Sequence, residues 1–148
     1  MSDTQIKSVA LFFFFAFFDE QRAIELTSKL LRLIRKRSRD ETLDTNSLIV
    51  KLSQKLVAKE SKRREIPPPP QDLTIFQIPE TVHLGYLHAL RKKVTLEEFS
   101  CVLWTKVLGL SETAVALGLD STIGTIRHRN SNAIKALGQI IPNTGAEA

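Results

Sequence analysis

The sequence is poor in the residues that build covalent or metal sites. It contains one cysteine and three histidines among 148 residues. A single cysteine excludes an internal disulfide bond, and we therefore expect a reducing, cytoplasmic environment. Cys101 stands between Phe99 and Trp104, a setting typical of a buried and unreactive thiol.

Signals for catalysis are also missing. His83 and His88 are five residues apart, whereas two metal ligands on one helix face are four apart. The chain has no glycine-rich phosphate loop, no nucleophile elbow and no carboxylate pair with a suitable partner. We expect a protein that is not an enzyme and uses no metal or other cofactor.

No hydrophobic run is long enough to cross a membrane. The longest covers residues 9–18 and contains six phenylalanines, but a spanning helix needs about 20 apolar residues. Asp19 and Glu20 follow directly, and no small-residue cleavage site does, so a signal peptide is not expected. The run predicts a buried core helix and no membrane insertion.

Repeats and the alternating pattern of β-strands are absent, and the apolar spacing predicts an all-α fold. Residues 67–70 are four prolines, which fix φ, remove donors and favour an extended chain. We expect two small helical units, residues 1–65 and 80–141, joined by a Pro-rich linker at 66–79.

Apolar residues of the first unit occur at helical spacing in 5–18 and in 19–37, and they predict a third helix that begins after a cap at Asn46 or Ser47. Residues 1–65 carry 14 basic and 9 acidic side chains, which accounts for the whole net charge of +5. Its third helix carries one basic stripe, formed by Lys51, Lys55, Lys59, Lys62, Arg63 and Arg64. Such a stripe is either a solvated helix face or a contact for a polyanion.

The second unit has clear helix starts and stops. Thr95 and Glu98 form a capping-box pattern, Ser111 and Thr122 are expected caps, and Gly109 and Gly118 are expected stops. Two short helices, a tight turn and a longer amphipathic helix that ends before Pro142 predict a helix-turn-helix.

The last helix has a surface suited to DNA. We expect six residues to face inward: Ile123, Ile126, Ala133, Ile134, Leu137 and Ile141. No acidic residue occurs between Asp120 and Glu147. The expected DNA-facing residues of this helix are Thr122, Thr125, Arg127, His128, Arg129, Ser131, Asn132 and Lys135. A helical hairpin with a polar outer face is the alternative.

These residues resemble a known family. The second unit contains, in this order, the segments Leu110-Ser111, Ala116, Leu119, Gly124-Thr125-Ile126-Arg127-His128-Arg129 and Ala133-Ile134-Lys135-Ala136-Leu137. Together they resemble region 4 of bacterial sigma-70-type RNA polymerase sigma factors. The resemblance implies that Thr125, Arg127, His128, Arg129 and Ser131 read the −35 promoter element. It also implies core RNA polymerase as a partner, promoter DNA as the target and an anti-sigma factor as a further partner.

The first unit has a fainter similarity to region 2 of the extracytoplasmic-function sigma factors. Residues 19–28 resemble the polymerase-binding part of that region, and residues 48–64 resemble its −10-reading end. By this resemblance the polymerase-binding residues are Arg22, Glu25, Leu26, Ser28 and Lys29, and the basic stripe contacts promoter DNA.

The sequence also departs from the family pattern. The turn after Gly118 is about two residues longer, Ser28 replaces a usual glutamine, and residues 46–64 contain no aromatic side chain. Two alternatives therefore stay open. One is a DNA-binding regulator that acts without polymerase, with the first unit as an oligomerisation or ligand module; the other is a degenerate sigma-like interaction module.

Overall fold

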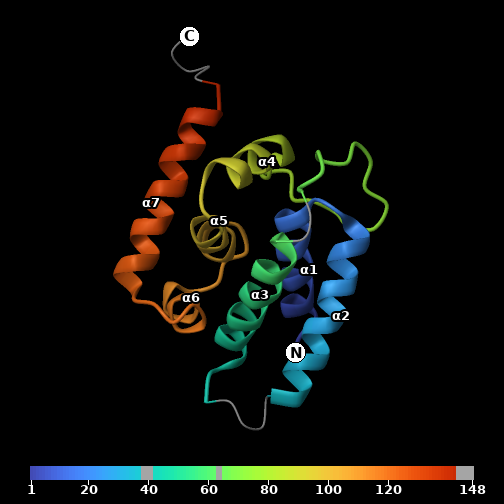
Figure 1. Ribbon diagram of the computed structural model, residues 1–148, viewed down its shortest axis with the longest axis vertical. Coiled ribbons are helices and arrows are strands. Elements are labelled where there is room, and N and C mark those ends of the chain that lie inside the picture. Colours follow the sequence, from blue (N-terminus) through green and yellow to red (C-terminus); the bar gives the residue numbers. More distant parts are fainter. Residues whose placement is uncertain (38–41, 63–64, 143–148) are drawn as a thin grey trace.

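Helices make up the fold of the described residues (Figure 1). The computed structural model describes residues 1–37, 42–62 and 65–142, which contain no β-strand. The elements are α1 (Asp3–Phe17), α2 (Glu20–Arg37), α3 (Thr45–Ser61), α4 (Leu84–Lys93), α5 (Leu96–Val102), the π-helix η1 (Leu103–Val107), α6 (Glu112–Gly118) and α7 (Ile123–Ile140). The predicted all-α fold is confirmed.

Helix α1 lies at the centre of the core. Val9 and the four consecutive phenylalanines Phe12 to Phe15 are completely buried, and Phe17 and Phe18 are nearly so. A helix that is apolar on every side must be surrounded by protein. The phenylalanine run is therefore a core helix, as predicted, and among the described residues no helix is both long and apolar enough to cross a bilayer.

Both halves of the chain cover α1. Phe12 stacks on Trp104 of η1, with ring centroids 4.3 Å apart and planes at 18°. Helix α3 of the first half packs along α6 of the second, and the buried residues of both halves form one core. The residues predicted as two helical units thus share a hydrophobic interior.

The Pro-rich linker is held against α2 and α4. It folds back along the bundle, where the Glu20 carboxylate accepts hydrogen bonds from the backbone amides of Thr74, Ile75 and Phe76. The backbone oxygen of Pro67 lies 2.8 Å from Nε2 of His88, on α4. An extended chain with few internal hydrogen bonds is fixed here by side chains of its neighbours.

Most helix starts follow the sequence signals. The Thr95–Glu98 capping box and the Ser111 and Thr122 caps are all present, and Gly109 has the left-handed φ of 77° expected of a helix stop. The start of α3 differs from the prediction, because Asp44 is its cap and not Asn46 or Ser47. Ser47 is buried instead, and its hydroxyl donates to the backbone oxygen of Ala114 at 3.0 Å.

The contact between α3 and α6 requires a glycine. A Cβ added at Gly118 would lie 2.6 Å from both the backbone oxygen of Ser47 and Cβ of Val50. Since backbone atoms cannot move aside as flexible side chains can, any larger residue pushes α6 away from α3.

We predict that Gly118→Ala lowers the free energy of unfolding by roughly 1–3 kcal/mol, the usual cost of overpacking. The matched control is Gly138→Ala on α7, where an added Cβ meets nothing within 4 Å. That change should stabilise the protein by about 0.5–1 kcal/mol, because alanine is the better helix former. Urea unfolding followed by circular dichroism measures both, and equal effects would contradict the packing described here.

The linker contact predicts a pH dependence. Partial desolvation raises the pKa of Glu20, but the hydrogen bonds from Thr74, Phe76 and Ile75 outweigh it and lower the pKa below the ordinary 4.5. Because the pKa of Glu20 is lower in the folded than in the unfolded state, its ionised carboxylate stabilises the folded protein at a pH above the unfolded-state pKa. This stabilisation is lost as the pH falls through the folded-state pKa.

We therefore expect the amide signals of Ile75 and Phe76 to titrate together below pH 4.5, followed by NMR. Glu20→Gln should abolish this titration, because the side chain no longer changes charge. The same substitution at exposed Glu80 should leave it intact. Titration that persists in Glu20→Gln would show that another group holds the linker.

Candidate nucleic-acid interface

Helices α6 and α7 lie where the sequence predicts the two helices of a helix-turn-helix, and each begins at its expected cap. The Ser111 hydroxyl accepts from the amide of Ala114 at 3.1 Å, and the Thr122 hydroxyl accepts from the amide of Thr125 at 3.1 Å. Between the helices Asp120 takes a left-handed φ of 52°, and the amide of Ser121 donates to the oxygen of Ala116 at 2.8 Å. The longer turn is therefore an ordered connection with its own hydrogen bond.

Helix α7 lies at the outer edge of the bundle, packed on α4, α5 and α6 (Figure 1). Its buried residues are Ile126, Asn130, Ala133 and Ala136. The opposite side is exposed along its length and carries Gly124, Arg127, His128, Ser131, Asn132, Ile134 and Lys135. Helix α7 contains no acidic residue.

The predicted inward set of isoleucines is only partly correct. Ile126 is fully buried, but Ile134 is 49% exposed and Ile123 and Ile141 are 37% and 39% exposed. Ala133, also predicted to face inward, is buried, Leu137 is half-buried, and Ala136 and Asn130 take the remaining inner positions, where the small alanines let α7 approach α5 closely. Ile134 therefore belongs to the outer surface.

Arg127 extends outward but has an acidic partner on α6. Its Nε lies 3.1 Å and 3.3 Å from the two carboxylate oxygens of Glu112, and Nη2 lies 3.2 Å from Oε1. The hydrogen bonds and the charge of Glu112 raise the pKa of Arg127. The Arg127 side chain nevertheless keeps 70% of its surface exposed, so an anion can reach it.

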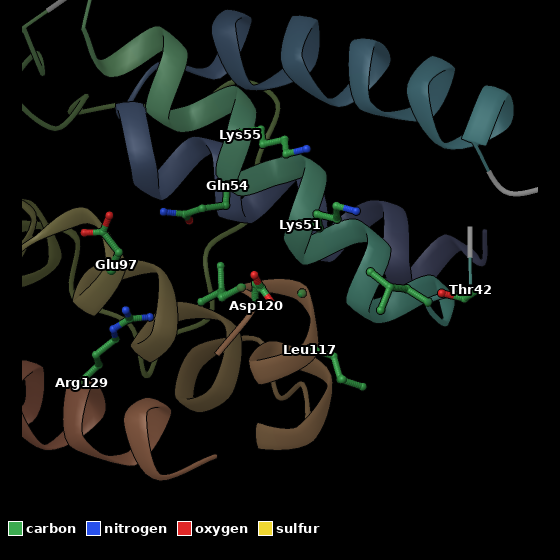
Figure 2. Close-up of a pocket in the computed structure, with 11 residues that line it drawn as sticks. Thr42, Lys51, Gln54, Lys55, Glu97, Leu117, Asp120 and Arg129 are labelled. Carbon is green, nitrogen blue, oxygen red and sulfur yellow. The ribbon is translucent and has the colours of Figure 1, made fainter. Parts of the chain in front are cut away.

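Arg129 points the other way, which corrects its predicted place among the DNA-facing residues. It lines a cleft of about 770 Å³ between the two halves of the chain, with Glu97 and Asp120 (Figure 2). Burial raises the pKa of the Cys101 thiol, and Arg129 beside it opposes this shift. Two residues along a helix turn the side chain by about 200°, so Arg127 and Arg129 cannot share one surface.

The basic stripe on α3 begins at the same cleft and continues beyond it. Half-buried Lys51 and exposed Lys55 lie on the wall across from Arg129, and Lys59 and Lys62 are exposed farther along the helix. Arg63 and Arg64 lie outside the described residues. The cleft therefore joins cations of both predicted DNA-binding sets, but it also contains two carboxylates.

The predicted polymerase-binding residues on α2 fall into two groups. Glu25 and Ser28 are exposed and Lys29 is half-buried. Leu26 is only 2% exposed and belongs to the core, so it cannot serve as a docking residue in this fold. Arg22 forms ion pairs with Glu25 and with the buried Glu60 of α3.

A buried polar contact holds α7 in place. Asn130 is 4% exposed, and its Nδ2 donates to the hydroxyl of Thr105 at 2.9 Å. That hydroxyl in turn donates to the backbone oxygen of Cys101 at 2.7 Å. The chain of bonds fixes the rotation of α7 about its axis, and so decides which side chains face outward.

A second acidic residue lies beside α7. The backbone hydrogen bond from Thr95 lowers the pKa of Glu98, and Asn132 and His128 of α7 act in the same direction. No signal in the sequence indicates that Glu98 and Glu112 are neighbours of α7. Both are helix-start residues of other elements, and only the packing brings them to α7.

The described residues contain no group of three or more histidine, cysteine or acidic side chains able to hold a metal ion. His83 caps α4, its Nδ1 accepting from the amide of Tyr86 at 3.3 Å, and His88 contacts the linker. Comparison of the chain with protein-family models, curated proteins and solved structures finds no match.

We predict that Asn130→Ala lowers the free energy of unfolding by about 1–3 kcal/mol, because it removes a buried hydrogen bond and leaves Thr105 without its donor. Asn132→Ala on the exposed side of the same helix should change it by less than about 0.5 kcal/mol. Thermal unfolding followed by calorimetry compares the two. Equal effects would mean that Asn130 does not anchor the helix.

Proposed function

We propose that the protein binds duplex DNA by placing α7 in the major groove, and that it acts as a sigma-like transcription initiation protein. One observation carries the proposal: the longest exposed helix face of the α6–α7 unit contains Arg127, His128, Ser131, Asn132 and Lys135 and no acidic residue of its own. Arginine, asparagine and hydroxyl groups are the side chains that contact phosphates and base edges.

The geometry of α7 supports this use. The helix has 18 residues and lies at the edge of the bundle, on the side away from α2 (Figure 1), and its outer side is exposed. Its start at Thr122 adds the partial positive charge of a helix N-terminus, which attracts phosphate.

The Arg127–Glu112 pair does not prevent such binding. An exposed ion pair contributes little free energy in water, because solvent already screens both charges. A DNA phosphate or a guanine edge offers Arg127 the same two-pronged geometry. Glu112 then holds the guanidinium extended before DNA arrives, and repels a phosphate placed too close to α6.

The sigma-like form of the proposal rests on the resemblance of residues 110–137 to region 4 and on the order of the two sigma-like segments. It assigns polymerase contact to the exposed part of α2, with Glu25 and Ser28, and promoter contact to α7 and to the exposed lysines Lys59 and Lys62 of α3. An anti-sigma factor would bind the same exposed surfaces.

A regulator that acts without polymerase is the second candidate, and the burial of Leu26 favours it. Co-purification with core RNA polymerase and promoter-specific transcription separate the two. A specific transcript that depends on this protein supports the sigma-like form. DNA binding with no association to core polymerase supports the second candidate and rejects the first.

Salt-dependent DNA binding tests the shared part of both. We expect Arg127→Ala to weaken binding to duplex DNA by roughly tenfold and to reduce the slope of log K against log salt by about one. Arg129→Ala is the matched control, since it removes the same charge two residues away but in the cleft. It should leave the slope nearly unchanged in fluorescence anisotropy titrations.

Glu112→Gln adds a third variant to the same titrations. Removing the carboxylate frees Arg127 for phosphate, so affinity should rise by about two- to fivefold. Binding that does not change in Arg127→Ala, or that falls equally in Arg129→Ala, would reject α7 as the DNA-contacting element.

A further inference from the structure

The C-terminal half of α2 has a strongly basic surface. Residues 29–37 contain no acidic residue and five cations, namely Lys29, Arg32, Arg35, Lys36 and Arg37. Lys29 is half-buried, and the other four are exposed. Helix α2 lies at the edge of the molecule opposite to α7 (Figure 1), so this surface is separate from the proposed DNA contact.

The fold leaves the charge of this surface uncompensated. None of the five cations has an acidic partner within 4 Å among the described residues. The nearest acidic residue of α2 is Glu25, which pairs with Arg22 at 3.1 Å. Lys36 follows Arg32 by four residues, and like charges at this spacing face each other and destabilise a helix. An external anion would remove this repulsion.

Between the cations the surface is hollowed and apolar. A depression of about 400 Å³ is lined by Lys29, Arg32, Leu33, Arg35 and Lys36, and nearly all of its exposed lining is apolar. The aliphatic parts of long basic side chains cover apolar surface in this way while their charged ends stay in water. The site therefore combines an apolar floor with a rim of cations.

This combination favours one class of partner. The phosphate backbone of DNA can pair with the cations but offers no apolar group to the floor. An anionic membrane requires a wide apolar face that enters the bilayer, and the half-buried Leu33 is the only apolar residue in this lining. An acidic amphipathic helix offers both groups, carboxylates for the rim and an apolar side chain for the floor.

The spacing of the cations matches a partner helix. Lys29, Arg32 and Lys36 follow one another by three and four residues, and Leu33 lies between the last two. At a rise of 1.5 Å per residue these steps are about 4.5 Å and 6 Å, as between carboxylates at positions i, i+3 and i+7 of another helix. The guanidinium of Arg32 can also bind one carboxylate through two hydrogen bonds.

We propose that the C-terminal half of α2 binds an acidic amphipathic helix of a partner protein. Its carboxylates pair with the cations of the rim, and one apolar side chain fills the depression beside Leu33. The proposal depends neither on DNA binding by α7 nor on association with polymerase.

Labelled helical peptides test this proposal on the unaltered full chain. The probe carries glutamates at i, i+3 and i+7 and a leucine between the last two; one control has glutamines in place of the glutamates. A second control has the composition of the probe in an order that spreads the carboxylates around the helix. In fluorescence anisotropy titrations we expect saturable binding of the probe, and binding about tenfold weaker for the first control and about fivefold weaker for the second.

The second control decides between a built site and general attraction of opposite charges. Equal binding of the probe and of the reordered peptide overturns the proposal, and so does the absence of saturable binding by the probe. Because the protein is unaltered in these titrations, neither result depends on the folding of a variant.

Variants locate the site. Arg32→Gln/Lys36→Gln should weaken binding of the probe by about tenfold, because it removes two cations of the rim. Lys92→Gln/Lys106→Gln is the matched control, since it removes two exposed cations from α4 and η1. It should change binding by less than about twofold, because salt screens distant charges. Equal loss of binding in the two pairs overturns the assignment.

The same variants are titrated with duplex DNA and with vesicles that contain phosphatidylglycerol. DNA affinity should change by less than about twofold in Arg32→Gln/Lys36→Gln, because α7 lies at the opposite edge of the molecule. Failure of this proposal can thus be distinguished from failure of the DNA proposal. Binding of DNA or vesicles that is lost in this pair, together with no preference for the probe, assigns the surface to nucleic acid or lipid and overturns the proposal.

Discussion

The burial of the C-terminal half of α1 on every side is the constraint on which the rest of the structure depends. Six phenylalanines lie between residues 12 and 18, five in α1 and Phe18 at its cap, and each buried aromatic side chain contributes roughly 1.5–3 kcal/mol, so no side of this segment can be left in water. The first half of the chain covers only part of it. The stack of Phe12 on Trp104 shows that the second half completes the cover. The two halves are therefore parts of one core.

This shared core ties α6 and α7 to the rest of the molecule. Helix α6 is too short to be stable alone, and it is held by α3 of the N-terminal half. Ser47 bonds to Ala114, and Gly118 lies directly against the α3 backbone. Any change in the N-terminal half that moves α3 must therefore move the frame on which α7 rests.

The same packing divides the basic residues. Asn130 fixes the rotation of α7, so that Arg127 faces outward and Arg129 faces the cleft. One side of α7 thus makes the proposed DNA contact, together with the partial positive charge at the start of the helix. The acidic side chains Glu112 and Glu98 lie beside this surface and limit the directions from which DNA can approach. A surface of this kind favours specific docking over general attraction to polyanions.

The sequence by itself determined the helices, the caps at Ser111 and Thr122, the buried α1 and the surface chemistry of α7, because these depend on local hydrogen bonds and on apolar spacing along a few turns. Only the tertiary structure decided that the halves share a core, that Leu26 and Ser47 are buried, that Arg129 turns inward and that Glu112 meets Arg127. These contacts join residues that are far apart in the sequence, and no local pattern predicts them. They depend on the angle at which helices cross and on which small residues let them approach, and those follow from the packing of the whole chain.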